Sequence, residues 1–341
     1  MMGGSLPYLW WMLLILGAVA LDWIVGDPVK IPHPIVWIGK CIGGLTKRLN
    51  TTPEIKGKSR AKGLLMWVVV IVLTGTVIAG VQWLCLKIHP VLFAVVTLWF
   101  LGTTLAEKSL RQAVEGVMKA LEADDLEQAR VQVGYLCGRD TSALSEHDVI
   151  RATVETTAEN TIDGILAPMF YMLVGMVLQH FLWFLSPLTL AMVYKAVNTM
   201  DSMTGYMQKP YTHYGYFPAK LDDAFNFPIA RLGSWMMLIA GAALGFDFKN
   251  GVRVYKRDHS MHKSPNAGHP ESAAAGLLRV QIGGTNIYFG QVVEKPTIGD
   301  ADTPLTADTV RQSLKIMTGS EMVFAVLATV VYIVAIFFQL R

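Results

Sequence analysis

The amino-acid sequence predicts an all-α fold, namely a polytopic integral membrane bundle of helices. Hydrophobic residues make up 52% of the chain and charged residues only 16%, and the mean hydropathy is positive. This composition is typical of a protein that crosses a bilayer several times. A spanning helix needs roughly 20 mostly apolar residues. Four apolar runs qualify as spans: Leu6–Val25, Leu64–Leu86, Val91–Leu105 and Met322–Leu340.

The first run indicates a retained span, because it lacks both a preceding cation and a small-residue cleavage site. The loop after it carries a cluster of basic residues: Lys30, Lys40, Lys47, Arg48, Lys56, Lys58, Arg60 and Lys62. The positive-inside rule places this loop in the cytoplasm; binding of phosphate or anionic lipid is the alternative reason for the cluster. We therefore expect a multi-pass protein of the bacterial inner membrane. The net charge of +3 says nothing about nucleic acid, because the cations lie where topology needs them, and we expect no nucleic-acid partner.

Residues 107–160 have the character of a cytoplasmic helical insert. Leu110, Val114, Val117 and Leu121 recur at helical spacing, which predicts one amphipathic helix, and the next stretch repeats the pattern. Asp124 and Asp125 lie where a cap between the two helices belongs, and a third helix should begin near Ser145.

Two shorter apolar segments, Ile165–Val177 and Phe181–Val197, predict a membrane hairpin. A seventh segment, Ile229–Phe246, either crosses fully or dips in and returns as a broken helix at Gly241 and Gly245. We favour the second arrangement, since irregular backbone is tolerated at membrane depth where it lines a cavity. Residues 199–228 and 247–319 are then cytoplasmic loops that contribute to a functional site.

A polar phrase occurs twice, once on each side of this hairpin. The first copy is Asn160-Thr161-Ile162-Asp163 and the second is Asn198-Thr199-Met200-Asp201. A hairpin returns both copies to one membrane face, and ionisable groups beside a span are costly unless they pair, bind an ion or line a wet cavity. The repeat therefore predicts a carboxylate-and-amide site that faces the cytoplasm, although simple helix capping is the alternative.

An acidic column continues the first copy. Glu155, Glu159 and Asp163 succeed one another at four-residue spacing and so share one helix face. Like charges at this spacing repel, and a divalent cation such as Mg²⁺ would relieve the repulsion. A solvated acidic helix face is the ordinary alternative.

Other polar segments are candidates for binding. Asp27-Pro28 is either a turn or part of the site, and Asp222-Asp223 adds two carboxylates of which at most one faces it. The segment His262–Glu271 is the densest polar phrase: its turn residues and Lys263 suit a phosphate, and Pro270-Glu271 should open a helix. Gly283-Gly284 is a second candidate phosphate turn. The spacing of His259, His262 and His269 matches no structural zinc site.

These phrases together resemble the adenosylcobinamide-phosphate synthase family, the CobD/CbiB proteins of cobalamin biosynthesis. The resemblance extends from Asp22 to about Asp300 and is carried, in chain order, by the phrases Gly26-Asp27-Pro28, His33-Pro34, Gly138-Arg139-Asp140-Thr141, Glu155, Ala158-Glu159-Asn160-Thr161, Asp163-Gly164, Ala167-Pro168, Tyr194-Lys195-Ala196-Val197-Asn198-Thr199, Asp201-Ser202, Gly205-Tyr206, Leu221-Asp222-Asp223, Ser264-Pro265-Asn266-Ala267-Gly268 and Pro270-Glu271. Any one phrase is weak, but the ordered combination is specific.

The resemblance implies a single membrane-embedded catalytic domain, residues 1–341, that joins a corrin-ring propionate of adenosylcobyric acid to the amine of an amino-alcohol phosphate such as aminopropanol phosphate. ATP is the expected cosubstrate and Mg²⁺ the expected cofactor. A carboxylate is a poor acyl donor, so ATP should convert it to an acyl phosphate, and cations must stabilise the charge that gathers.

The implied roles of the site residues divide into three groups. The candidate metal ligands are Glu159, Asp163 and Asp201. The candidate bases for the amine proton are Glu155 and Asp222. These five residues form the predicted catalytic set. The candidate substrate- and nucleotide-binding residues are Asp27, Arg139, Asn160, Lys195, Asn198, Ser202, Lys263, Ser264, Asn266 and Glu271.

Two other functions are compatible with the same residues. Doubled Asn/Asp phrases with Mg²⁺ also suit a membrane phosphoryl or prenyl transferase, and paired repeats at mid-membrane suit a transporter. A homo-oligomer, or association with other corrinoid-assembly enzymes, is a further expectation.

Overall fold

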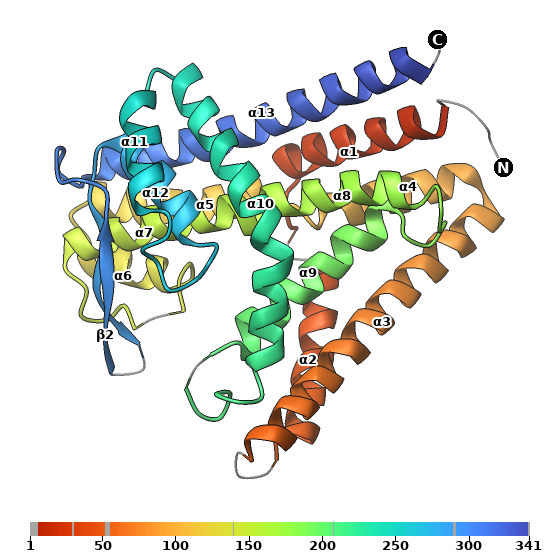
Figure 1. Cartoon of the computed structure of the whole chain (residues 1–341), viewed down its shortest axis with the longest axis horizontal. Helices are drawn as coiled ribbons and strands as arrows, with labels where there is room; N and C mark the ends of the chain where they lie inside the picture. The colour runs from red at the N-terminus through yellow and green to blue at the C-terminus, as the bar shows by residue number, and fades with distance from the viewer. Residues whose placement is uncertain are drawn as a thin grey trace. The chain divides into compact units, whose positions relative to one another are not determined.

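The computed structural model describes residues 6–28, 31–51, 55–138, 140–206, 208–288 and 291–339. The chain forms two compact units (Figure 1). The first comprises Met1–Ala106, Ala167–Asn226 and Thr329–Arg341, and the second comprises Glu107–Leu166 and Phe227–Ala328. Each unit is described by itself.

The predicted all-α class is confirmed. Within the described ranges, four helical stretches are long and apolar enough to cross a membrane: Lys56–Ile88, Pro90–Glu122, Glu146–Leu178 and Ala307–Val334. They contain the predicted runs Leu64–Leu86, Val91–Leu105 and Ile165–Val177 and most of the run that begins at Met322, while the first run is a shorter apolar helix. The chain is therefore a multi-pass membrane protein by helix length and composition.

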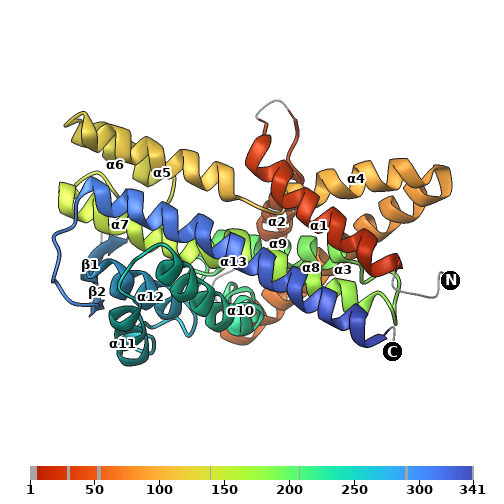
Figure 2. The same cartoon turned by 90° about the horizontal axis from the view of Figure 1, so that it is seen from above.

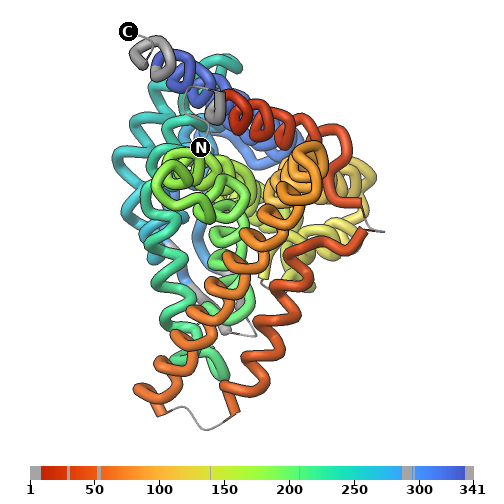
Figure 3. The backbone as a smooth tube through the Cα atoms, turned by 90° about the vertical axis from the view of Figure 1, so that its right-hand side faces the viewer, coloured from red at the N-terminus to blue at the C-terminus, as the bar shows by residue number. Residues whose placement is uncertain are grey.

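The first unit packs α1 (Leu6–Ile24) against α4 (Pro90–Gly102), as Figure 2 shows. The helices α2 (Pro34–Leu49) and α3 (Lys56–Ile88) run beside each other (Figure 3), and α8 (Ala167–Leu178) pairs with α9 (Pro187–Thr204) as the predicted hairpin. Apolar side chains of α2, α3 and α9, with Tyr214, form a core: Ile42, Met66, Val70, Ala196, Val197, Met200 and Tyr214. This core fixes one side of α9, which leaves its other side for polar residues.

The second unit begins with the predicted helical insert, here α5 (Glu107–Glu122), α6 (Leu126–Gly134) and α7 (Glu146–Asn160). Both predicted caps are confirmed. The Asp125 carboxylate accepts a hydrogen bond from Gln128 N–H (2.9 Å), and the Ser145 hydroxyl oxygen accepts one from Asp148 N–H (3.2 Å). Such caps satisfy backbone donors that have no partner inside the helix.

After Asn160 the α-helix widens into η1, a π-helix over Thr161–Leu166. The two copies of the polar phrase therefore differ in structure, because the second copy lies in the regular α-helix α9. A π-turn contains more residues than an α-turn, so Asp163 does not continue the four-residue column of Glu155 and Glu159.

Segments predicted as loops are largely regular structure. Residues 199–228 contain the end of α9 and the start of α10 (Tyr216–Ala243), and residues 247–319 contain the helices α11 (Phe248–Asp258), α12 (Gly268–Leu278) and the start of α13 (Ala307–Gln339). The expected break within Ile229–Phe246 was wrong at Gly241, because α10 is continuous there; the chain turns after it, at Gly245, whose φ is +84°.

The structure adds a two-stranded antiparallel hairpin that the sequence did not predict. Strand β1 (Ile282–Tyr288) pairs with β2 (Gln291–Ile298), with a bulge between Gly283 and Thr285. Gly283 and Gly284 have φ values of +84° and +80°, a region that glycine adopts without the Cβ clash of other residues. The glycine pair thus serves a strand bulge and not a separate phosphate turn.

The helices α11 and α12 approach each other closely through glycines. A Cβ atom built on Gly276 would lie 2.8 Å from the Cα atom of Gly251 and 2.8 Å from the Cβ atom of Val254. Any side chain at Gly276 would therefore force the two helices apart.

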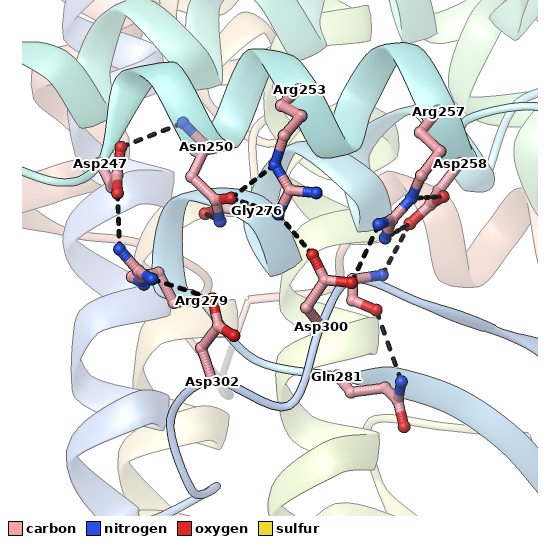
Figure 4. Close-up of polar contacts among 11 residues, drawn as sticks. Asp247, Asn250, Arg253, Arg257, Asp258, Gly276, Arg279, Gln281, Asp300 and Asp302 are labelled. Atoms are coloured by element: carbon pink, nitrogen blue, oxygen red, sulfur yellow. Dashed lines mark hydrogen bonds and ion pairs between the residues drawn. The ribbon is translucent and has the colours of Figure 1, made fainter.

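A network of ion pairs, which we call the polar clamp, joins α11 and the end of α12 to the loop after β2 (Figure 4). Its charged members are Asp247, Arg253, Arg257, Asp258, Arg279, Asp300 and Asp302. Asp258 is its buried member, 2% exposed, and accepts hydrogen bonds from Arg257 and from the Gly299 N–H. The polar clamp fixes the loop after β2 against α11.

Candidate functional site

The first unit contains a pocket of about 740 Å³ that brings four of the predicted binding residues together. Asp27, Lys195, Asn198 and Ser202 all line it, along with His33. Ligand sites of small molecules are typically clefts of a few hundred to a thousand cubic ångströms with few, convergent polar groups. The pocket is therefore the first candidate binding site.

One wall of the pocket is a single face of α9. Lys195, Asn198, Thr199 and Ser202 occupy positions i, i+3, i+4 and i+7 of this helix, which places them in one column. The Thr199 hydroxyl donates to the Lys195 carbonyl (2.6 Å), and the Ser202 hydroxyl donates to the Asn198 carbonyl (2.9 Å). These bonds hold both hydroxyls against the helix, where their lone pairs can still accept hydrogen bonds.

Asp27 and His33, which precede α2, also line the pocket. The Asp27 Oδ1 atom lies 3.1 Å from His33 Nε2. His33 is also the N-cap of α2, and its Nδ1 atom accepts a hydrogen bond from Ile35 N–H (3.2 Å). Because Nδ1 accepts, the proton of a neutral ring lies on Nε2, the atom that contacts Asp27.

A buried polar chain lies elsewhere in this unit. The Tyr194 hydroxyl donates to Asn226 Oδ1 (2.8 Å), and Asn226 Nδ2 donates to Asp222 Oδ2 (3.0 Å). Asp222, the predicted base, is 8% exposed. The hydrogen bond from Asn226 holds one oxygen of the Asp222 carboxylate in place.

Asp201, a predicted metal ligand, lies near the end of α9. Burial, together with the charge of the neighbouring Asp223, raises the pKa of its carboxyl to about 6. Asp201 therefore retains part of its proton near neutral pH unless a cation offsets the cost of the charge.

The second unit gathers a different set of ligand-type side chains. Single ligand atoms of Glu159, His262 and Glu271 all lie within 4.8 Å of one another. Glu159 is at the end of α7, His262 is in the loop before α12, and Glu271 is in the first turn of α12, where it is 2% exposed. Two ligands of Mg²⁺, each at about 2.1 Å from the ion, are at most about 4.2 Å apart. Two atoms at the 4.8 Å bound would therefore have to approach each other by about 0.6 Å or more to bind one ion.

The tautomer of His262 determines what this cluster can hold. Ser264 N–H donates to His262 Nδ1 (2.9 Å), so the proton of the neutral ring lies on Nε2. In this form His262 is a hydrogen-bond donor, and the carboxylates of Glu159 and Glu271 are the oxygen ligands. Hard cations such as Mg²⁺ prefer this kind of donor set.

The loop before α12 is shaped by its own polar residues. The Ser264 hydroxyl oxygen accepts hydrogen bonds from the backbone N–H groups of Asn266 and Ala267 (3.2 and 3.3 Å). Asn266 is 8% exposed, and its Oδ1 atom lies 3.5 Å from Arg231 Nη1. The helix begins at Gly268 and not, as predicted, at Pro270.

The other two histidines of this loop pack together around Tyr255. The Tyr255 hydroxyl lies 2.9 Å from His269 Nδ1, and the rings of His259 and His269 have centroids 4.8 Å apart. Burial lowers the pKa of His269 to about 4, with Arg231 and His259 acting in the same direction. His269 is therefore neutral at physiological pH, which fits a packing role.

Comparison with known proteins identifies relatives of this amino-acid sequence. The profile of the CobD/Cbib protein family matches residues 15–317. The chain belongs to the CobD/CbiB family. It is 39% identical over 323 residues to the cobalamin biosynthesis protein CobD of Clostridium acetobutylicum, covering 94% of this chain and 98% of that protein.

Two further family members show the same extent of similarity. The chain is 41% identical to the cobalamin biosynthesis protein CobD of Geobacter metallireducens, over 93% of this chain and 95% of the relative. It is 40% identical to the cobalamin biosynthesis protein CbiB of Salmonella arizonae, over 89% and 92%. No solved structure matches the chain. The resemblance inferred from the motifs is confirmed.

The structure places the CobD/CbiB phrases in both units. Asp27, Lys195, Asn198, Asp201, Ser202 and Asp222 belong to the first unit, and Glu155, Glu159, Asn160, Asp163, Lys263, Ser264, Asn266 and Glu271 belong to the second. Convergence of the two Asn-Thr-x-Asp copies on one pocket stays a prediction. Arg139 lies outside the described residues, and Lys263 is exposed.

Two predicted residues of the CobD/CbiB phrases have structural partners. Glu155 is 4% exposed, and its Oε1 atom accepts a hydrogen bond from Gly283 N–H (2.9 Å) and lies 3.9 Å from Arg151 Nε. Asn160 donates from Nδ2 to the Thr156 carbonyl (2.9 Å). Glu155 thus holds the β-hairpin against α7, a contact that periodicity along one helix cannot reveal.

Three side chains at these sites had no predicted role: His33, His262 and Arg231. His33-Pro34 was part of the family phrase, and an N-cap followed by proline is a recognisable helix start. His262 begins the predicted polar phrase, but its proximity to Glu159 depends on another element, as does the contact of Arg231 with Asn266.

Proposed function

We propose that the chain is an ATP-dependent amide ligase that joins adenosylcobyric acid to aminopropanol phosphate, or to a related amino-alcohol phosphate, to give adenosylcobinamide phosphate. Membership of the CobD/CbiB family over residues 15–317 carries this proposal. The polar pocket of the first unit and the carboxylate cluster of the second support it, because the reaction must bind phosphates, a carboxylate and an amine.

The reaction proceeds in two steps. A carboxylate oxygen of the corrin side chain attacks the γ-phosphorus of ATP, so that an acyl phosphate forms and ADP leaves. The amine then attacks the carbonyl carbon, the bond from this carbon to the phosphate oxygen breaks, and the amine gives up a proton. Phosphoryl transfer depends mainly on positioning and on stabilisation of negative charge.

Mg²⁺ fits the carboxylate pair of the second unit, where Glu159 and Glu271 would hold it and His262 would donate a hydrogen bond beside it. When bound, the ion supplies charge neutralisation for the triphosphate and the transferred phosphoryl group. The alternative ligands Asp163 and Asp201 stay predictions.

Purified protein in lipid nanodiscs tests the proposal. With ATP, Mg²⁺, adenosylcobyric acid and aminopropanol phosphate, we expect the amide product by mass spectrometry, with one ADP per amide. Glu271→Gln should raise the Mg²⁺ concentration for half-maximal rate at least tenfold, whereas Glu127→Gln, whose side chain is 82% exposed, should not. Lack of the amide, alongside turnover of a polyprenyl diphosphate, would replace this function with a membrane transferase.

A further inference from the structure

The pocket of the first unit is lined by side chains of opposite charge. Asp27 lies on the wall before α2, and Lys195 lies on the wall formed by α9, with Asn198 and Ser202 on the same helix face. A site that offers both a carboxylate and an ammonium group to one cavity is matched to a ligand that carries both charges.

The Asp27 side is oriented by a second residue. His33 uses Nδ1 to accept the Ile35 N–H, and its Nε2 atom lies 3.1 Å from Asp27 Oδ1. The ring is anchored at the start of α2, so this contact restricts the position of the carboxylate of Asp27. Its side chain is 30% exposed, which leaves the carboxylate in reach of a ligand in the pocket.

The Lys195 side has the composition of a phosphate subsite. Lysine acts as a point charge toward phosphate. The Asn198 amide lies one turn further along the same face of α9, and the Ser202 hydroxyl lies two turns from Lys195. The O–H of Ser202 can rotate from the Asn198 carbonyl, which it contacts at 2.9 Å, to donate to a phosphate oxygen. The volume of about 740 Å³ exceeds what a small amino-alcohol phosphate needs, so the rest can admit the acyl phosphate end of the second reactant.

We propose that this pocket binds the amino-alcohol phosphate as a zwitterion, with its ammonium group on Asp27 and its phosphate on Lys195, Asn198 and Ser202, and that Asp27 accepts the amine proton. This inference rests on the proposed ligase function. The ammonium nitrogen has no free lone pair, so it first gives one proton to a carboxylate oxygen of Asp27. The nitrogen then bonds to the acyl carbon, the bond from this carbon to the phosphate oxygen breaks, and the second N–H proton leaves with the departing phosphate. His33 is a positioning residue that acts through Asp27.

Two substitutions separate this role from a structural one. Asparagine is a strong N-cap residue, so His33→Asn keeps an acceptor for the Ile35 N–H but removes the contact with Asp27. Asp27→Asn keeps the shape of the acceptor and removes its charge. Glu127→Gln removes an exposed carboxylate elsewhere and is the matched control.

Binding to the whole protein in nanodiscs is measured by calorimetry with aminopropanol phosphate and with its amine-free analogue, isopropyl phosphate. Wild type and Glu127→Gln should prefer the amine-bearing ligand. Asp27→Asn should reduce this preference roughly 10- to 100-fold, the worth of a charge-assisted hydrogen bond. His33→Asn should reduce it by a smaller factor, and Lys195→Met should weaken both ligands about equally.

Turnover supplies an independent readout. Without its base, Asp27→Asn should depend on the free amine already present in solution, so its rate should rise about tenfold per pH unit below the amine pKa, more steeply than wild type. An unchanged ligand preference in Asp27→Asn, together with a wild-type pH profile, would overturn the inference even if the amide product forms. Failure of wild type to form the amide would instead reject the ligase function, while the binding ratios still test the pocket.

Discussion

Replacing Asp258 by asparagine should destabilise the second unit, because this carboxylate is the buried centre of the polar clamp. It accepts hydrogen bonds from Arg257 Nε (2.6 Å), Arg257 Nη2 (2.7 Å) and Gly299 N–H (2.8 Å). An asparagine has only one acceptor oxygen, and its amide group would oppose one of these donors.

The magnitude depends on which donor loses its partner. A buried N–H group left without an acceptor costs about 1–3 kcal/mol. The guanidinium of Arg257 is 44% exposed and can be rehydrated, so the lost ion pair adds at most about 1 kcal/mol. The total of about 1–4 kcal/mol corresponds to a fall in Tm of roughly 2–16 °C for a unit of this size.

The pH dependence has a definite sign. Burial alone would raise the pKa of Asp258, but the hydrogen bonds from Arg257 and Gly299 outweigh it and hold the pKa below its ordinary 3.8. The carboxylate therefore stabilises the fold above about pH 4, and this contribution is lost as the pH falls through the lowered value. Asp258→Asn should lack this acid-dependent loss.

Thermal unfolding in detergent, combined with hydrogen exchange at Gly299, measures both effects. Asp302→Asn is the control, since Asp302 is 39% exposed and pairs only peripherally with Arg279 (3.0 Å); its cost should stay below about 1 kcal/mol. Equal Tm values for the two variants, or unchanged exchange at Gly299 in Asp258→Asn, would refute this account of the clamp.

Two further outcomes are expected from close contacts. Gly276→Ala should lower the free energy of unfolding by about 1–3 kcal/mol through overpacking of α11 and α12. Gly44→Ala is the control and should be neutral or stabilising, because its Cβ would meet no described atom within 4 Å. Equal melting temperatures of the two variants would contradict this. Glu155→Gln keeps an acceptor for the Gly283 N–H, so amide formation should fall less than about tenfold; a loss of more than a hundredfold would show that Glu155 is the amine base.

Local patterns predicted much of the fold. The helical insert and the caps at Asp125 and Ser145 were predicted because periodicity and capping depend on residues near one another in sequence. The β-hairpin formed by β1 and β2 was not predicted, because Gly283 and Gly284 interrupt β1 with left-handed backbone. In the sequence, such a glycine pair resembles a turn.

The site was predicted unevenly for the same reason. Four residues of the first-unit pocket were named in advance, since Lys195, Asn198 and Ser202 share one helix face by spacing alone. The partners of Glu159, namely His262 and Glu271, lie far along the chain, and no local rule pairs them. Glu155 accepts a hydrogen bond from Gly283 N–H, a contact that depends on a strand the sequence did not reveal. Its predicted role in catalysis stays a prediction.

The wide turn at Thr161–Leu166 has a consequence for how this chain tolerates change. A π-turn is equivalent to one residue inserted into an α-helix, so removing a single residue there would restore ordinary helix without rotating the residues after Leu166. Elsewhere in α7 the same deletion would rotate every later side chain by about 100°. Length variation in this helix should therefore concentrate within η1, with Asp163 as the side chain whose direction changes most.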